Sequence, residues 1–343
     1  MKRIFGIFLI FSLLLTGCSV PAATADNTRQ YTATFLNLFD TVTTIIGRAE
    51  SEEAFKEKAQ AIHDDLLYYH ERFDIYNDYE GLNNIKTIND NAGIAPVKVD
   101  QAIIDLLLDC KEFYDLTGGK VNVMMGSVLR LWHEARSDGI NDPPHAALPN
   151  MEALREAAGY CGFELLQINA EASTAYITDP NARLDVGAVA KGWATQQAAE
   201  NAPEGMLISV GGNVCATGPK LSDGTPWVIG IQDPDAADKN LHTVFAAKTS
   251  VVTSGDYQRA YVVDGKSYHH IIDPETLMPA GYWRSVSVIC PDSGLADALS
   301  TALFLMDLDA GRELAEQSGA EVLWVAADGT EYQTHGFQEM LRT

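Results

Sequence analysis

Beyond residue 30 the chain runs to its end without a break in composition. No repeat, low-complexity tract or shift in residue usage divides it. Short runs rich in β-branched and aromatic residues alternate there with segments whose apolar residues recur at helical spacing. A chain of 343 residues can bury a sizeable core without disulfide bonds. The pattern therefore predicts a single α+β domain over residues 33–340, with room for an insertion around residues 120–160.

The predicted helices have recognisable ends. Ser51 can cap a helix over residues 51–73, and Gly118-Gly119 can end a second helix over residues 100–117. Three prolines between residues 143 and 149 then predict a long loop. Further helices are expected at Met151–Ala158, Gly187–Asn201 and Gly294–Met306. Strands are expected at Phe35–Gly47, Leu165–Asn169, Thr174–Ile177, Met206–Val210, Trp227–Gln232, Thr243–Ala247 and Ser285–Cys290.

The first residues have the pattern of an export signal. Lys2 and Arg3 precede an apolar run, Ile4–Leu15, that is short for a membrane span. The run leads into Thr16-Gly17-Cys18, which resembles the lipobox of bacterial lipoproteins. The resemblance implies an extracytoplasmic protein that an N-terminal lipid anchors to the cell membrane. An ordinary cleaved signal peptide with a chance cysteine is the alternative. The implied segments are a lipoprotein signal peptide at residues 1–17, lipidation of Cys18 and a tether at residues 18–32.

Charge limits the partners that this chain can have. Its 24 Lys and Arg residues face 47 Asp and Glu residues, which gives a formal net charge of −23 at pH 7. Nucleic acid is therefore not expected as a partner, because phosphate binding needs clustered basic residues. A phosphate-bearing ligand would need local positive potential from a metal ion, a helix N-terminus or a few basic side chains.

The cysteines after Cys18 all lie in apolar segments. Their spacing fits no zinc motif. In an exported protein they could form disulfides, but their surroundings favour buried thiols. These residues are Cys110, Cys161, Cys215 and Cys290.

Small residues surround the expected turn from a strand into a helix after Asp185. Gly187, Ala188 and Gly192 leave room for a ligand to approach the backbone amides at the helix start. Lys191 follows one helical turn later and can reach a phosphate or carbonyl oxygen. A tight packing joint with a solvated lysine would produce the same pattern.

Two glycine-containing segments are weaker signals. Gly211-Gly212-Asn213 permits close approach to the backbone, but a β-bulge or a hairpin explains it equally well. Asp264-Gly265 predicts a hairpin of residues 261–263 with residues 267–272, which places His270 at a strand end. A histidine there can act as a general acid or base, or simply form hydrogen bonds within the fold.

Asp297 and Thr301 lie four residues apart in an otherwise apolar helix, so they share one face. Oxygen ligands at this spacing suit Mg²⁺, which takes few protein ligands and completes its shell with phosphate and water. The alternative is structural: Asp297 caps the helix and Thr301 bonds back to a helix carbonyl.

Taken together, these segments resemble the ApbE-like family of FAD:protein FMN transferases. Five blocks stand in the family's order and spacing, and the resemblance extends over residues 33–335. It implies one T-fold-related domain of mixed antiparallel sheets and helices. The blocks are Asp185-Val186-Gly187-Ala188-Val189-Ala190-Lys191-Gly192, Val210-Gly211-Gly212-Asn213, Thr253-Ser254-Gly255-Asp256-Tyr257, His270-Ile271-Ile272-Asp273-Pro274 and Ala296-Asp297-Ala298-Leu299-Ser300-Thr301-Ala302.

The resemblance implies a Mg²⁺-dependent enzyme that transfers FMN from FAD to a Ser or Thr hydroxyl of a target protein and releases AMP. The implied acceptor belongs to a membrane redox complex and carries a Ser/Thr flavinylation motif. Two alternatives remain open. One is a Mg²⁺-dependent FAD pyrophosphatase, in which water replaces the hydroxyl, and the other is a lipoprotein that binds flavin without reacting.

The resemblance also assigns roles to individual residues. His270 or a neighbouring carboxylate would deprotonate the acceptor hydroxyl, and Asp297 would hold the metal that activates the phosphate. The residues implied to contact FAD are Asp185, Lys191, His270 and Ile271. The residues implied to bind the metal are Ala188 and Ser300 through their carbonyls, and Asp297 and Thr301 through their side chains.

Three upstream segments depart from the family pattern and concern the contacts to the isoalloxazine ring. Phe39-Asp40-Thr41 stands where the family usually has Met-Gly-Thr. Tyr76 stands where an aromatic residue packs by the flavin. Lys120-Val121-Asn122 stands where a triplet of a small, an aromatic and an acidic residue is common.

Overall fold

The computed structural model describes residues 28–342. The predicted signal peptide, the lipidation site Cys18 and most of the predicted tether therefore lie outside the described residues. Strand β1 (Arg29–Leu38) begins inside the predicted tether, so the folded domain starts a few residues before position 33. Within residues 28–342, no helix combines the length and the apolar character needed to cross a membrane.

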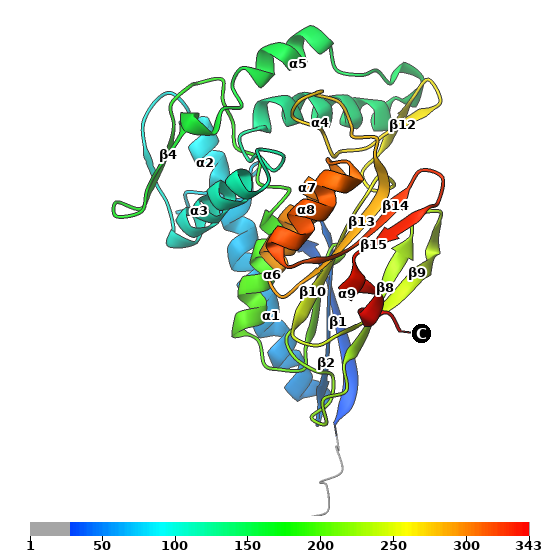
Figure 1. Ribbon diagram of the computed structural model, residues 1–343. Coiled ribbons are helices and arrows are strands. Elements are labelled where there is room, and N and C mark those ends of the chain that lie inside the picture. The colour runs from blue at the N-terminus through cyan, green and yellow to red at the C-terminus, as the bar shows by residue number, and fades with distance from the viewer. Residues whose placement is uncertain (1–27, 343) are drawn as a thin grey trace, which may run out of the picture.

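A sheet of eight strands organises the domain, and all neighbouring strands in it are antiparallel (Figure 1). Its order is β1-β2-β6-β7-β10-β13-β14-β15. Because side chains alternate across a strand, Val251 and Val252 of β10 enter different cores on the two faces of this sheet. The strands after β1 are β2 (Thr41–Ala49), β6 (Leu207–Val210), β7 (Asn213–Ala216), β10 (Thr249–Gly255), β13 (Trp283–Cys290), β14 (Glu321–Ala326) and β15 (Glu331–Gln333).

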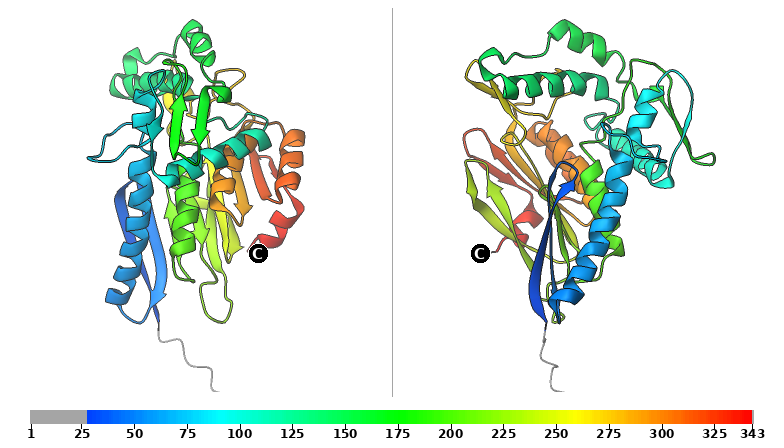
Figure 2. Two further views of the ribbon diagram at one scale, coloured as in Figure 1. Left: turned by 90° about the vertical axis from the view of Figure 1, so that its left-hand side faces the viewer. Right: turned by 180° about the vertical axis from the view of Figure 1, so that it is seen from behind.

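Helices cover one face of this sheet, and a hairpin with a short helix covers the other (Figures 1 and 2). The larger core lies under the helices, where Phe55, Leu299 and Trp324 are buried. The covering helices are α1 (Glu52–Phe73), α6 (Ala190–Asn201), α7 (Ser293–Phe304) and α8 (Leu308–Ser318). The elements on the opposite face are β8 (Trp227–Asp233), β9 (Ala236–Ala246) and α9 (His335–Met340).

A smaller unit with its own core, which we call the cap, lies at one end of the molecule (Figure 1). The indole N–H of Trp132, at the centre of this core, donates to the carbonyl of Leu277 at 3.0 Å. The cap consists of α4 (Gly126–Asn141), η1 (Pro143–His145), α5 (Met151–Ala158), β11 (Tyr261–Val263) and β12 (Lys266–Tyr268). The remaining elements are α2 (Ile85–Asp90), β3 (Val97–Lys98), α3 (Gln101–Leu116), η2 (Phe163–Leu165), β4 (Leu166–Asn169) and β5 (Thr174–Ile177).

Much of the predicted secondary structure is confirmed. Ser51 caps α1, since its Oγ accepts a hydrogen bond from the Ala54 amide at 3.1 Å. The hairpin at Asp264-Gly265 also forms, although β12 ends at Tyr268 rather than Ile272. The four cysteines after Cys18 are buried free thiols, as their apolar surroundings indicated.

Other predictions of secondary structure were wrong. Residues 35–47 form not one strand but parts of β1 and β2, which a tight turn at Phe39 and Asp40 connects. Both turn residues have positive φ, 50° and 49°, and the pair is not the Asn-Gly, Asp-Gly or Gly-Gly sequence that usually signals such a turn. The loop predicted after Gly119 contains the 16-residue helix α4. The prolines on which that prediction rested begin only after the helix has ended at Asn141.

Candidate active site

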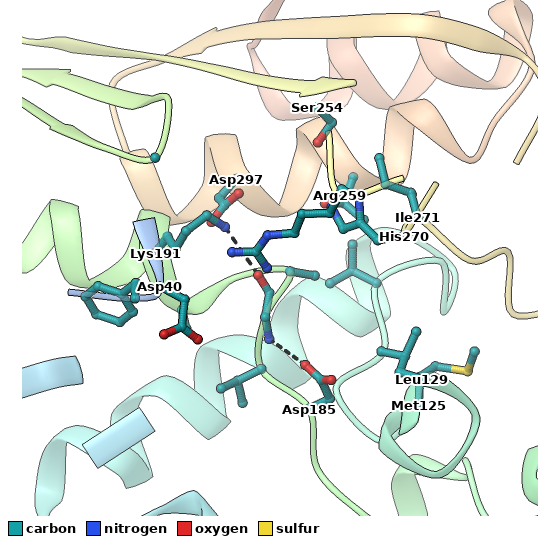
Figure 3. Close-up of a pocket in the computed structure, with 18 of the residues that line it drawn as sticks. Asp40, Met125, Leu129, Asp185, Lys191, Ser254, Arg259, His270, Ile271 and Asp297 are labelled. Carbon is teal, nitrogen blue, oxygen red and sulfur yellow. Dashed lines mark hydrogen bonds and ion pairs between the residues drawn. The ribbon is translucent and has the colours of Figure 1, made fainter. Parts of the chain in front are cut away.

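One cavity brings together residues from the larger core, the β1–β2 turn and the cap (Figure 3). Of the residues assigned to the site from the sequence, Ser300 alone does not line it. Those that do are Phe39, Tyr76, Lys120, Val121, Asn122, Asp185, Ala188, Lys191, His270, Ile271, Asp297 and Thr301.

Helices α6 and α7 form one wall of the cavity, which we call the α6–α7 wall. Asp297 and Thr301 both line the cavity from α7, one helical turn apart. Asp292 occupies the N-cap of α7, because its Oδ1 accepts a hydrogen bond from the Leu295 amide at 2.8 Å. This excludes the alternative in which Asp297 caps the helix.

The carboxylate of Asp297 is nearly buried, with 6% of its side chain exposed. Its Oδ2 accepts a hydrogen bond from the Gly192 amide at 2.8 Å and lies 3.7 Å from Nζ of Lys191. A Cβ atom at Gly192 would lie 2.3 Å from the Cβ of Asp297. Gly192 is therefore required for the close contact that positions this carboxylate.

The turn before α6 is held by its own hydrogen bonds rather than by a strand. Asp185 Oδ1 accepts from the Gly187 amide at 2.9 Å (Figure 3). The side chain of Asn89 bonds both the amide and the carbonyl of Leu184, at 2.7 and 2.9 Å. These contacts replace the strand expected before Asp185. Lys191 Nζ then donates to the Gly187 carbonyl at 3.4 Å.

The residues of this wall offer oxygen donors that suit Mg²⁺. Asp297 supplies a carboxylate and Thr301 a hydroxyl, and Ala188 lines the same cavity. The Ser300 hydroxyl is occupied by Ser254 Oγ at 2.8 Å and by the Asp297 carbonyl at 2.9 Å. Residues 28–342 hold no cluster of three His, Cys, Asp or Glu residues that could bind a metal. A carboxylate and a hydroxyl on one helix face fit an ion that takes few protein ligands and relies on phosphate and water.

His270 lies across the cavity from this wall. Its Nδ1 is 3.2 Å from the Gln258 carbonyl, so the tautomer that donates there leaves Nε2 as an acceptor. Burial lowers the pKa of His270 to about 3, and the positive charges of Arg259 and Lys191 add to this effect. The ring is consequently neutral at physiological pH. The neighbouring residue Ile271 is buried and contributes apolar surface to the cavity.

Aromatic side chains line another part of the cavity. The Phe39 amide donates to Nδ1 of His70 at 3.2 Å, and the two rings lie 5.3 Å apart. The Tyr76 hydroxyl lies 3.1 Å from Nδ1 of His133. Desolvation, with the negative charge of Asp185, raises the pKa of Tyr76 to about 12, so Tyr76 is a neutral hydrogen-bonding group.

The segment Lys120-Val121-Asn122 connects this region to the cap. Lys120 Nζ pairs with Glu275 at 2.7 Å and lies 3.6 Å from Asp273. Burial favours a lower pKa for Lys120, but these carboxylates outweigh it and raise the pKa. The Asn122 side chain donates to the Cys161 carbonyl at 2.9 Å. The polar groups of Lys120 and Asn122 are thus already engaged within the protein.

Comparisons with known proteins agree with this geometry. The model of the ApbE family matches residues 39–324. The chain belongs to the ApbE family. A protein of Treponema pallidum named FAD:protein FMN transferase is 32% identical over 277 residues, which cover 75% of each chain. The transferase of the same name from Haemophilus influenzae is 28% identical, covering 71% of this chain and 72% of its own.

Solved structures agree with the family assignment. The ApbE protein of Thermotoga maritima superimposes with a TM-score of 0.79 at 29% identity, covering 92% of this chain and all of its own. The flavin transferase ApbE of Vibrio cholerae shares the fold, with a TM-score of 0.75 at 24% identity and the same coverage. The predicted domain of mixed antiparallel sheets and helices is confirmed.

In this ApbE family member the cavity also contains charged residues that sequence analysis did not assign to the site. Arg259 lines the cavity with a positive φ that its sequence context does not signal, and the carboxylate-bearing Asp40 of the Phe39-Asp40-Thr41 segment lines it too. His133 lines it from α4, the helix that was predicted to be a loop. Burial lowers the pKa of His133, although the Asp185 charge opposes this shift.

Proposed function

We propose that the protein transfers the FMN moiety of FAD to a Ser or Thr hydroxyl of an acceptor protein and releases AMP, with Mg²⁺ as cofactor. The observation that carries the proposal is the arrangement of Asp297, Thr301 and Lys191 around one cavity in a strongly acidic chain. Membership of a family whose relatives are named FAD:protein FMN transferases supports the same reaction.

The charges of the α6–α7 wall suit a diphosphate. Mg²⁺ bound by Asp297, Thr301 and the Ala188 carbonyl would neutralise the diphosphate oxygens and the charge that develops on the departing AMP. Lys191 adds a second positive charge, since its Nζ lies 3.7 Å from the Asp297 carboxylate. The start of α6 adds the positive end of a helix dipole.

The reaction needs an acceptor for one proton. The hydroxyl oxygen of the acceptor forms a bond to the FMN-side phosphorus, the bond from that phosphorus to the bridging oxygen breaks, and AMP leaves. His270 receives the hydroxyl proton at Nε2, the acceptor nitrogen of the tautomer whose Nδ1 donates to the Gln258 carbonyl. A bound diphosphate would offset the charges of Arg259 and Lys191, which raises the pKa of His270 when a base is needed.

We further propose that the protein works outside the cytoplasm, attached to the membrane through lipidated Cys18. The N-terminal sequence supports this, since a basic start, a short apolar run and Thr16-Gly17-Cys18 follow one another. An acceptor within a membrane redox complex would share the same surface, which raises the effective concentration of the two proteins. Labelling with a radioactive fatty acid tests the anchor, because Cys18→Ser should remove the label.

The decisive experiment incubates the purified protein with FAD, Mg²⁺ and an acceptor domain that carries a Ser/Thr flavinylation motif. Transfer predicts a fluorescent acceptor band in a denaturing gel and AMP in equal amount. The same acceptor with its target Thr replaced by Ala should stay dark. Free FMN with AMP, and no labelled acceptor, would instead identify a pyrophosphatase. Bound flavin without AMP would identify a binding protein.

A further inference from the structure

Arg259 has an unusual place in the cavity. It lies between β10 and β11, with a left-handed φ of 47° that costs free energy for a residue other than Gly or Asn. Its side chain lines the cavity and extends toward Lys191 of the opposite wall (Figure 3). The backbone therefore holds a cation inside the site at a conformational cost.

The guanidinium of Arg259 has no hydrogen bond or ion pair with any side chain or backbone group in residues 28–342. Arg284, in contrast, pairs with Asp235 and Asp256, each at 2.8 Å. Arg72 likewise lies 3.1 Å from Asp100. A chain with 47 acidic residues could readily supply such a partner. The positive charge of Arg259 is thus left available to a ligand.

A second cation lies close by. Arg136 on α4 is only partly exposed, and no ion pair within residues 28–342 neutralises it. Burial lowers the pKa of Arg136, and the charge of Arg259 is the next largest cause. The two guanidinium groups carry like charges, which repel each other in the free protein. An anion bound next to them would relieve that repulsion.

We propose that Arg259 binds the diphosphate of FAD from the side opposite the α6–α7 wall. This inference rests on the proposed function, which brings a diphosphate to the Lys191 side of the cavity. The planar guanidinium can donate two parallel hydrogen bonds to phosphate oxygens, which a lysine cannot do. Arg259 and Lys191 then hold the diphosphate between two cations from different parts of the fold.

The test compares the affinities of riboflavin, FMN, ADP and FAD for the wild type, Arg259→Gln and Arg259→Lys, by calorimetry in the presence of Mg²⁺. Both substitutions keep a long side chain at the same positive φ. Arg259→Gln should weaken the binding of FAD and ADP by about tenfold or more and change the affinity for riboflavin less than about twofold. The FAD and ADP affinities of Arg259→Lys should lie between those of the wild type and those of Arg259→Gln. Arg155→Gln, an exposed arginine on α5, removes the same charge and should change none of the affinities.

Three results would overturn the inference. Arg259→Gln could bind FAD and ADP like the wild type. Its affinity for riboflavin could also fall by the same factor as its affinity for FAD, which would indicate a role in cavity shape. It could also keep its FAD affinity and lose only transfer to the acceptor, which would place Arg259 against the acceptor. Thermal unfolding without ligand provides the folding control, since removal of one of two repelling charges should leave the melting temperature unchanged or higher.

The proposed function can fail separately. A wild-type protein that binds FAD but never labels an acceptor would refute FMN transfer. The loss of ADP affinity in Arg259→Gln would still establish the diphosphate contact.

Discussion

The α6–α7 wall and the cap approach the same cavity but are built differently. On the wall, Asp297 is nearly buried, and Gly192 packs so closely against it that no side chain would fit between the helices. The cap has a separate small core, and its α4 contributes His133 to the lining of the cavity. The groups that we propose to hold a metal thus lie where the two helices pack closely.

The largest effect on activity should come from removing the negative charge of Asp297 on the α6–α7 wall. Asp297→Asn keeps an oxygen that can accept from the Gly192 amide but no longer supplies an anionic metal ligand. We expect AMP release from FAD to fall about 10³-fold or more, because several kcal/mol of charge stabilisation are lost. Asp309→Asn, an exposed carboxylate on α8, is the matched control and should keep full activity. Wild-type rates in Asp297→Asn would refute the metal assignment.

Stability should depend strongly on the packing between α6 and α7. In Gly192→Ala the new methyl group would meet the Asp297 Cβ at 2.3 Å and the Ser293 carbonyl at 2.4 Å. Forced overpacking of this kind costs about 3 kcal/mol of the free energy of unfolding. Gly281→Ala adds the same methyl where nothing lies within 4 Å, and should change little. Urea unfolding of both variants measures the difference, and equal stabilities would show that the helices can separate at low cost.

The independence of the cap can be tested through its central indole. Trp132→Phe loses the hydrogen bond to the Leu277 carbonyl and leaves a small cavity, at a cost of about 2 kcal/mol. Hydrogen exchange should accelerate in α4 and the β11–β12 hairpin but not in β10 or β13. Trp324→Phe, in the larger core, should have the opposite pattern, and its indole N–H has no partner to lose. Uniform acceleration in both variants would mean that cap and sheet unfold as one unit.

A smaller effect should appear in the pH dependence of stability. Above the ordinary pKa of 6.5, His270 is neutral in both the folded and the unfolded protein. Between pH 6.5 and about 3, His270 binds a proton in the unfolded chain but not in the folded protein. The free energy of unfolding therefore decreases by roughly 1 kcal/mol for each unit by which the pH is lowered. His270→Gln removes this dependence, and its melting temperature should fall less steeply over that range. Parallel curves for the two proteins would contradict the lowered pKa of His270.

The difference between the α6–α7 wall and the cap also explains which site residues the sequence could predict. Asp297 and Thr301 were found because a helix converts a spacing of four residues into a shared face, and Lys191 was found because it follows a glycine-rich turn. The cap residues come from segments far apart in the chain, and the helix that supplies His133 was hidden by the prolines after it. Arg259 owes its position to a positive φ angle, which arginine seldom adopts. Only the folded backbone reveals such angles.

The central claim is that α7 supplies a carboxylate and a hydroxyl to a divalent cation that the diphosphate of FAD shares. The most direct measurement is FAD affinity with and without Mg²⁺, for the wild type and for Asp297→Asn. We predict that Mg²⁺ strengthens FAD binding at least about tenfold in the wild type and has no effect in the variant. An equal gain in both proteins would place the cation elsewhere and contradict this account.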